Sequence, residues 1–353
     1  MFITYLNIHP IKAMSCQYSV VIRTLGNAGA KYQMLLDSIK SQTIPPSEII
    51  VALPEGYDPP IERIGNERFV YGEKGMVRQR HAGIEAASSA FMLLCDDDIS
   101  FPSDFVEQCC LRLLSHEADA VIPARPEDYD TSHGAKAMFR NTLLRMYLMF
   151  TGQVFPAVFQ RTFRYAVAPT GGIIALYSID RHKTYLAQSG AGGCLFMKGK
   201  TAKAIRFQEE AWLDDAAYAL PEDHVFLYKS YLGGNKLLYT PDIEYEHLDA
   251  SSSMEGSIHT ARRAKWLYAT SRNYTIFWNR FLFFPATSSL YRLFLFLCLM
   301  FRMTSMTVFF FLSGILSRAG RECFKSLLMG YRDAFILIKQ PYYKHLPKIT
   351  KHV

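Results

Sequence analysis

Short apolar runs alternate with amphipathic segments in the first part of the chain. Tyr18–Arg23 and Glu48–Leu53 are rich in β-branched residues and predict two strands, and Phe69–Val70 predicts a short third strand. Between the first two, Ala30–Lys40 carries apolar residues at helical spacing and ends before Pro45. A strand, a helix and a strand in this order form a βαβ unit, so we expect a parallel sheet with right-handed crossovers.

The same alternation continues to about residue 122. A helix is predicted at Gly75–Ser88, with an inward stripe formed by Val77, His81, Ile84 and Ser88. Phe91–Cys95 predicts a buried strand, another helix follows from Pro102, and Ala118–Ile122 predicts a further strand. A mostly parallel sheet with helices on both faces is typical of an α/β protein, which is the fold class that we expect.

The pattern between residues 124 and 190 is irregular, apart from a helix expected at Ala135–Met149. We interpret residues 124–190 as an insertion near the sheet edge that shapes the pocket of a second substrate. After it, Leu195–Met197 and Lys236–Thr240 predict strands, and Pro221–Tyr231 predicts a helix between them.

The C-terminal region has a different character. Arg262–Asn279 predicts an amphipathic helix, and Leu290–Leu316 is intensely apolar although Arg292 and Arg302 interrupt it. The uncharged run 303–317 is shorter than the roughly 20 residues of a membrane-spanning helix, and basic residues follow it. We therefore divide the chain into a domain of residues 1–250 and a helical, membrane-associating region of residues 251–353. A kinked or re-entrant membrane segment, burial against the first domain and a homo-oligomer interface are the alternatives.

Composition and charge narrow the classes of function. Half of the 353 residues are hydrophobic, which supplies a substantial core. The net charge of +7 favours phosphate-bearing ligands or an anionic membrane surface, and no interleaving of aromatic and basic residues indicates nucleic-acid binding. The seven cysteines contain no CxxC motif and are expected to be buried hydrophobes in a reducing compartment. The first residues lack a signal-peptide pattern, so we expect a cytoplasmic domain.

The candidate chemistry begins where the strand Phe91–Cys95 runs into Asp96, Asp97 and Asp98. Three adjacent carboxylates cannot be buried unpaired, so they must lie where the strand leaves the core, at the sheet edge that binds ligands in α/β proteins. In an extended chain Asp96 and Asp98 point to one side and Asp97 to the other. Two such oxygen ligands suit a divalent cation that also binds phosphate oxygens, and a solvated acidic turn is the alternative.

Other stretches are candidates for the same site. The glycine-dense Gly190–Cys194 allows a close approach of the backbone to a ligand, and is equally typical of an ordinary turn. Arg80, in the helix before the triplet, is a candidate for a phosphate contact. Glu222 and Asp223 open a predicted helix, where carboxylates often only complement the helix dipole. His247, beside two glutamates, is either a metal ligand or a structural histidine.

In this order and spacing, the landmarks resemble the family-2 glycosyltransferases of GT-A fold, which are inverting enzymes with nucleotide-sugar donors. Ser19–Thr24 is similar to the first strand and turn of that family, and Arg80–Ile84 resembles its R-N-x-G-I helix with a histidine in place of the asparagine. Asp96–Asp98 matches its DxD motif, and Pro221–Asp223 matches its acidic E-D pair. The resemblance covers residues 18–248.

The resemblance implies a metal-assisted transfer of a sugar from a nucleotide diphosphate to a hydroxyl group. Asp98, with Asp96 and His247, would hold Mn²⁺ or Mg²⁺ against the diphosphate. Asp223 is the candidate general base, with Glu222 as the second choice. The residues that would bind the rest of the donor are Thr24, Glu55, Arg80, Asp96 and Asp97.

The chain departs from the family after the second strand, where Leu53–Gly56 replaces the usual base-reading aspartate. Glu55 is the candidate substitute, and we expect a UDP- or dTDP-linked donor. The C-terminal region resembles the membrane-associated extension of members that build bacterial surface polysaccharides. This implies a glycan or lipid-linked acceptor and a place at the cytoplasmic face of the cell membrane.

Two alternatives remain open. A catalytically inert, membrane-bound scaffold of the same fold would have lost the chemistry, but both acidic motifs are retained in this chain. A sugar nucleotidyltransferase would need a G-x-G-T-R-like loop after the first strand, and Arg23–Asn27 does not supply that pattern.

Overall fold

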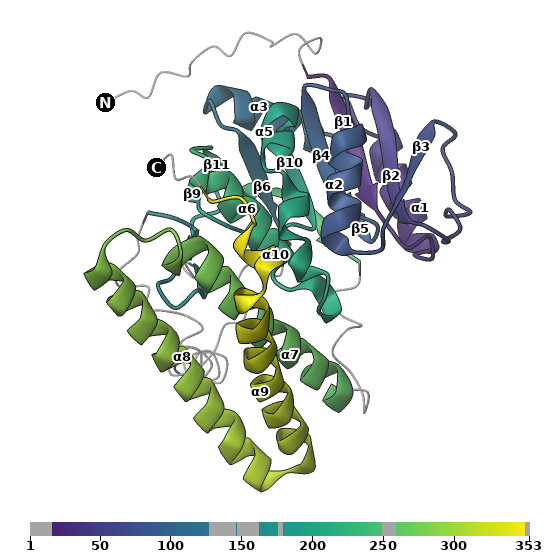
Figure 1. Cartoon of the computed structure of the whole chain (residues 1–353). Helices are drawn as coiled ribbons and strands as arrows, with labels where there is room; N and C mark the ends of the chain where they lie inside the picture. Colours follow the sequence, from purple (N-terminus) through teal and green to yellow (C-terminus); the bar gives the residue numbers. More distant parts are fainter. Residues whose placement is uncertain (1–15, 127–145, 147–161, 176–178, 249–258, 350–353) are drawn as a thin grey trace, which may run out of the picture.

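A computed structural model describes residues 16–126, 146, 162–175, 179–248 and 259–349 of the chain. Its centre is an eight-stranded sheet of order β3-β2-β1-β4-β10-β6-β11-β9 (Figure 1). The parallel half consists of β1 (Tyr18–Arg23), β2 (Glu48–Pro54), β3 (Glu67–Gly72) and β4 (Phe91–Asp96). The other half consists of β6 (Ala120–Ala124), β9 (Tyr185–Ala187), β10 (Cys194–Lys198) and β11 (Leu237–Glu244). Because β10 is antiparallel to β4 and β6, the sheet is mixed but mostly parallel.

The sheet lies between two layers of helices. Side chains alternate along each strand, so Val20 and Ile22 pack on one face and Val21 packs on the other. The first face is covered by α1 (Ala30–Lys40) and α3 (Phe105–Ser115). The second face is covered by α2 (Met76–Ala86), α5 (Gly199–Ala204) and α6 (Glu222–Leu232). The α/β fold class expected from the sequence is confirmed.

The inward stripe predicted for α2 is wrong in part. Val77 and Ile84 are buried as expected, but His81 is only half-buried and Ser88 lies exposed beyond the end of the helix. The buried positions are instead Val77, Gln79, Arg80, Gly83 and Ile84. The helix packs closely on β1, since a Cβ at Gly83 would lie 2.5 Å from a methyl carbon of Val21. This close approach turns the polar residues 79 and 80 toward the sheet.

The region expected to be an insertion is described only in part. β7 (Tyr165–Val167) and β8 (Ile173–Ala175) pair as a separate two-stranded sheet, whereas β9 joins the edge of the main sheet. The helix expected at Ala135–Met149 lies outside the described residues except for Met146, which is helical. The acceptor-side role of this region stays a prediction.

One cysteine pair differs from the expectation. Cys16, just before β1, forms a disulfide with Cys110 of α3, and their Cα atoms are 6.6 Å apart. The remaining cysteines are buried and not disulfide-bonded, as predicted: Cys95, Cys109, Cys194, Cys298 and Cys323. No local spacing signals the pair, because its members are 94 residues apart and meet only when α3 packs on the sheet.

Helices of the C-terminal region pack beside the sheet domain (Figure 1). They are α7 (His259–Trp278), a π-helical turn (Asn279–Phe283), α8 (Ser289–Leu316), α9 (Arg318–Lys339) and α10 (Pro341–Lys344). By length and composition α8 could cross a membrane, with a mean hydropathy of 1.9 and 39% of its most apolar window buried in the protein. Phe281, Leu295 and Ala334 belong to the same hydrophobic cluster as the α2 and α6 face of the sheet.

A buried charged cluster joins these helices to the sheet domain. Glu210 lies in the 3-10 segment Phe207–Leu213 and is fully buried. Its carboxylate accepts hydrogen bonds from Arg280 at 2.6 and 2.8 Å and from Lys229 of α6 at 2.9 Å. Burial alone would raise the pKa of Glu210, but Lys229 and Arg280 hold it below its usual value. The cluster therefore keeps three buried charges mutually satisfied.

We predict that Glu210→Gln destabilises the protein by about 3–5 kcal/mol, because it leaves the buried Arg280 without its counter-charge and leaves Lys229 paired with Glu209 alone. Urea denaturation followed by circular dichroism measures the free energy of unfolding. The matched control is Glu322→Gln, which removes an exposed pair with Lys325 and should cost less than about 1 kcal/mol. Equal losses in the two variants would show that the buried cluster does not hold the two parts together.

Candidate active site

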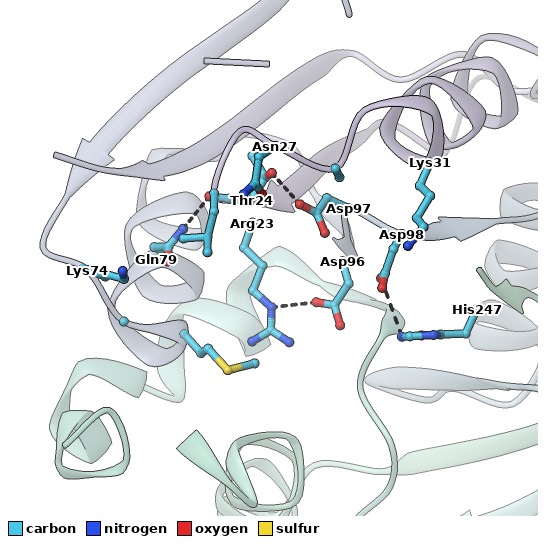
Figure 2. A pocket seen from close by; sticks show the side chains of 14 residues that line it. Arg23, Thr24, Asn27, Lys31, Lys74, Gln79, Asp96, Asp97, Asp98 and His247 are labelled. Carbon is cyan, nitrogen blue, oxygen red and sulfur yellow. Dashed lines mark hydrogen bonds and ion pairs between the residues drawn. The ribbon is translucent and has the colours of Figure 1, made fainter. Parts of the chain in front are cut away.

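A candidate site lies at the carboxyl ends of β1 and β4. These strands are parallel neighbours, and their register places Arg23, the last residue of β1, opposite Asp96, the last residue of β4. A cavity of about 520 Å³ opens at this edge (Figure 2). Its lining includes the whole acidic triplet together with Arg23, Thr24, Asn27, Lys31, Lys74, Gln79 and His247.

Each carboxylate of the triplet has a different partner. Asp96 accepts a hydrogen bond from Nε of Arg23 at 2.6 Å, and Asp97 accepts one from the hydroxyl of Thr24. Oδ1 of Asp98 lies 3.5 Å from Nε2 of His247. Burial raises the pKa of Asp97 to about 6, with the neighbouring carboxylates adding to the effect and the Thr24 hydroxyl opposing it. The three carboxylates thus bind three different neighbours.

Asp96, Asp98 and His247 form a cluster of potential metal ligands. One donor atom from each lies within 4.8 Å of the other two. A short ribbon positions the histidine, because β12 (Glu246–His247) pairs antiparallel with β5 (Ile99–Ser100) directly after the triplet. The Leu248 amide also donates to the carbonyl of Asp98 at 2.8 Å. The structure therefore brings together the three residues that the sequence predicted as ligands.

The second acidic pair lies beside this cluster, at the start of α6. Nη2 of Arg80 donates to Oε1 of Glu222 and to Oδ1 of Asp223, both at 2.9 Å. Nη1 of Arg23 donates to the same Glu222 oxygen, while Nε of Arg23 holds Asp96. Arg23 therefore links the triplet to the Glu222–Asp223 pair, although the two motifs are far apart in the sequence.

The two carboxylates of this pair have different proton affinities. Burial raises the pKa of Glu222 to about 8, against the opposing charges of Arg23 and Arg80. Burial would also raise the pKa of Asp223, but Arg80 and Arg23 lower it below its usual value. The side chain of Asp223 is 30% exposed and that of Glu222 only 4%. Asp223 is thus the ionised and reachable member of the pair.

The glycine-dense stretch before β10 makes room for these carboxylates. A Cβ at Gly192 would lie 2.4 Å from Oδ1 of Asp223, and a Cβ at Gly193 would lie 3.6 Å from Oδ2 of Asp96. The Gly193 carbonyl also accepts a hydrogen bond from the Asp96 amide at 2.9 Å. The backbone of this stretch therefore lies close to the carboxylates of Asp223 and Asp96, and its approach to a ligand stays a prediction.

Two candidate donor-binding residues lie away from the cavity. Arg80 is 4% exposed and is not part of the cavity lining, because its guanidinium is directed at the Glu222–Asp223 pair. Glu55 is exposed just after β2 and does not line the cavity either. Arg80 thus holds carboxylates in this structure rather than facing the space where phosphates would bind. Thr24, Asp96 and Asp97 do line the cavity.

Several cavity residues were missed by the sequence analysis. Arg23 was placed in the first strand but not in the site, although its position at the carboxyl end of β1 was a usable signal. Lys31 in the first turn of α1 and Lys74 just before α2 bring positive charge to the cavity wall. Gln79 donates to the carbonyls of Thr24 and Ala52 and so fixes α2 against the ends of β1 and β2.

A further missed residue supports the wall from outside. Asp214, after the 3-10 segment, accepts hydrogen bonds from the amides of Val77 and Arg78 at 3.0 and 3.2 Å. It therefore caps α2 from a distant part of the chain. The close contact needs a glycine, since a Cβ at Gly75 would lie 2.2 Å from the Asp214 carboxylate. Gly75 itself lines the cavity, so this cap fixes part of its wall.

Part of the chain is similar to a known protein family. Residues 19–167 match the family model described as glycosyl transferase family 2. The matched segment contains Thr24, Arg80 and the acidic triplet, whereas Glu222, Asp223 and His247 lie beyond it. No curated protein sequence matches the chain.

Solved structures show a distant similarity. S. aureus TarS 1–349 in complex with UDP-GlcNAc is 13% identical with a TM-score of 0.44, over 91% of this chain and 92% of that chain. GalNAc-T7 with UDP, GalNAc and Mn²⁺ is 12% identical with a TM-score of 0.43, over 79% of this chain. The alignment covers 54% of the GalNAc-T7 chain, so this protein spans about half of its length. These values are too low to transfer chemistry from either protein.

We predict that Glu222→Gln becomes more stable relative to the wild type as the pH rises from 5 to 8. An acid whose pKa is raised in the folded state stabilises the fold while it keeps its proton. For Glu222 this stabilisation is fully present below about pH 4 and is lost as the pH rises through its folded-state pKa of about 8. Glutamine mimics the protonated acid at every pH, so the variant does not lose this stabilisation as the pH rises. The free energy of unfolding of the wild type minus that of the variant should fall by more than about 1 kcal/mol over this range, measured by urea denaturation.

The matched control is Glu55→Gln, at an exposed position outside the cavity. Its difference from the wild type should not change with pH over the same range. A constant difference for Glu222→Gln as well would show that Glu222 is already ionised at pH 5.

Proposed function

Because residues 19–167 match the model of glycosyl transferase family 2, we propose that this protein is an inverting glycosyltransferase that moves a sugar from a nucleotide diphosphate to a hydroxyl group. The observation that carries the proposal is the link made by Arg23 between the triplet and the Glu222–Asp223 pair. One end of the site then suits a diphosphate and the other end holds a carboxylate base. A direct displacement needs both ends within one site.

The residues at the first end fit a divalent cation, Mn²⁺ or Mg²⁺. Asp96 and Asp98 supply oxygen atoms, His247 supplies a nitrogen, and all three face the same cavity within 4.8 Å of one another. Nε2 is the ring nitrogen of His247 that faces Asp98. When bound, such a cation neutralises the negative charge that develops on the departing diphosphate.

The donor is proposed to be a UDP- or dTDP-linked sugar. Lys31 and Lys74 line the cavity and provide positive charge for the phosphate groups, in the place where the sequence analysis had put Arg80. The hydroxyl of Thr24 holds Asp97 and so fixes the turn after β4. Glu55 is not retained as the base-reading residue, because its side chain lies outside the cavity.

Asp223 is proposed as the general base. Its oxygen takes the proton of the acceptor hydroxyl while the hydroxyl oxygen forms a bond to the anomeric carbon. The bond from that carbon to the diphosphate oxygen breaks, and its electron pair leaves with the diphosphate. Glu222 is the weaker candidate because its side chain is only 4% exposed. Arg80 keeps Asp223 ionised and fixes its orientation.

The acceptor is proposed to be a glycan or a lipid-linked saccharide at the cytoplasmic face of the cell membrane. The support for a membrane location is α8, whose length and apolar composition are those of a membrane-associated helix. Insertion residues 124–190 are proposed to contribute to the acceptor side of the pocket.

We expect Asp98→Ala to lose Mn²⁺-dependent binding of a nucleoside diphosphate without loss of folding, because it removes one of three clustered donor atoms. Calorimetric titration of UDP, dTDP and GDP, each with and without Mn²⁺, measures this. The control is Asp180→Ala, an exposed aspartate outside the cavity, which should bind as the wild type does. Equal binding by wild type and Asp98→Ala would exclude the cluster as the metal site.

We expect Asp223→Asn to bind the donor normally but to transfer sugar at least about a hundredfold more slowly, since the amide cannot accept the proton. A panel of nucleotide sugars, screened for Mn²⁺-dependent hydrolysis, first identifies the donor used for this measurement. Glu222→Gln is the comparator in the same charge cluster and should retain more activity. An inactive Glu222→Gln beside an active Asp223→Asn would reverse the assignment of the base.

A further inference from the structure

One side of α8 is apolar and exposed along the whole helix. Leu297, Leu312 and Leu316 lie on different turns of the helix and are 57, 53 and 85% exposed. Other members of this apolar stripe are Leu290, Leu293, Phe301, Val308 and Ile315. From Leu293 to Leu316, Thr304 is the only exposed residue of α8 with a polar side chain. The stripe is therefore continuous rather than a set of scattered surface residues.

The arginines that interrupt the apolar run do not interrupt the stripe. Arg302 is 5% exposed, donates to the carbonyl of Thr170 at 3.2 Å and lies 4.7 Å from the ring centre of Tyr274. Arg292, near the start of α8, turns back and donates to the carbonyl of Ala286 at 2.7 Å. Arg302 is thus buried, whereas Arg292 is exposed at the first turn of α8, before Leu293, and the outward face beyond it stays apolar.

A basic stripe runs along the neighbouring helix. α8 and α9 lie side by side, joined by Met306 and Phe310 on one helix and Cys323 and Leu327 on the other (Figure 1). The exposed basic residues of α9 are Arg318, Arg321, Lys325, Arg332 and Lys339. Their spacings of three, four and seven residues place them on one face of the helix.

The charges of α9 argue against a spanning orientation of α8. If α8 crossed a bilayer, its packing partner would be carried into the hydrocarbon with Lys325 and Arg332 in the middle of α9. Each charged side chain at the centre of a bilayer is strongly unfavourable, and these two are 67 and 68% exposed, in surface pairs with Glu322 and Asp333, rather than buried in protein. A helix that lies along the surface places the apolar stripe in lipid and leaves the charges at the level of the headgroups.

A protein partner fits the stripe less well than lipid. Protein interfaces carry about one hydrogen bond per 100–200 Å² and a polar rim. Across the exposed side chains from Leu293 to Leu316 the hydroxyl of Thr304 is the one polar group available. Acyl chains need no hydrogen bonds, and anionic headgroups complement the adjoining basic stripe.

We propose that α8 lies in the plane of a lipid surface with its outward stripe among the acyl chains, and that the basic stripe of α9 makes this binding selective for anionic lipids. The proposal specifies the membrane contact of the proposed function and does not depend on the sugar-transfer chemistry. Lipid binding is measured without substrates, so its failure is distinguishable from a failure of the proposed activity.

The test is sedimentation of the full chain with vesicles of phosphatidylcholine alone or with about one third phosphatidylglycerol. Point variants are used instead of a deletion of α8 and α9, because Leu295 and Ala334 of these helices belong to the core shared with the sheet domain. Leu297→Glu with Leu312→Glu should weaken binding to both vesicles by at least about tenfold, since two leucine side chains that would enter the acyl chains are lost. Lys325→Gln with Arg332→Gln should reduce the preference for anionic vesicles by about tenfold or more while leaving binding to neutral vesicles unchanged.

The control is Ile61→Glu, at a loop residue that is 94% exposed and outside the stripe, which should bind as the wild type does. Thermal melts check that every variant is folded. Unchanged vesicle binding by the double glutamate variant would overturn the proposal. If that variant also turned a wild-type dimer into a monomer in analytical ultracentrifugation, a second copy of the chain would be the occupant of the stripe.

A depth measurement separates an in-plane helix from a spanning one. Tryptophan is introduced singly by Leu297→Trp and Leu312→Trp, and quenching by lipids brominated at shallow or deep positions is compared with that of the wild type. The two positions are separated by roughly 22 Å along the helix. Equal, shallow depths are expected for α8 in the plane, and clearly unequal depths would overturn that orientation.

Discussion

The guanidinium groups of Arg80, which is buried, and of Arg23, which is 11% exposed, hold three carboxylates together at the edge of the sheet that carries the candidate site, and the layout of the site depends on them. Arg23 reaches Asp96 and Glu222, and Arg80 reaches Glu222 and Asp223. Buried charges are tolerated only when they are paired, so the end of β4 and the start of α6 must stay together. The cluster contains three carboxylic acids and two guanidinium groups, so its net charge is zero when one of the acids keeps its proton. The raised pKa of Glu222 indicates that Glu222 is the protonated acid.

This arrangement also explains why α2 carries polar residues on its inner side. Gln79 and Arg80 are buried because they satisfy groups at the ends of strands, namely backbone carbonyls and the acids of α6. Gly83 lets the helix come close enough to β1 for these side chains to reach. A helix that looks weakly amphipathic in sequence is therefore placed by polar contacts as much as by apolar packing.

Much of the fold follows from local patterns, whereas the pairings of the site do not. The bounds of α1 and β1 and the position of α6 were predicted because apolar period and caps are local properties. The meeting of Asp96, Asp98 and His247 was expected only through the family resemblance. The contact of Arg80 with the Glu222–Asp223 pair was not foreseen and Arg23 was missed, because the direction of a long side chain depends on strand register and on a helix far away in sequence. The disulfide of Cys16 was missed for the same reason.

The segment around Glu210 shows how the C-terminal helices and the cavity form one body. Glu210 binds Arg280 beyond α7 and Lys229 of α6, the helix that begins with the Glu222–Asp223 pair. Four residues later Asp214 caps α2 at the cavity wall. The Glu210 contacts join side chains of packed elements, and the Asp214 contacts join a side chain to the backbone amides of α2. If α8 binds a surface, the pairs of Glu210 with Arg280 and Lys229 would fix the orientation of the cavity relative to that surface.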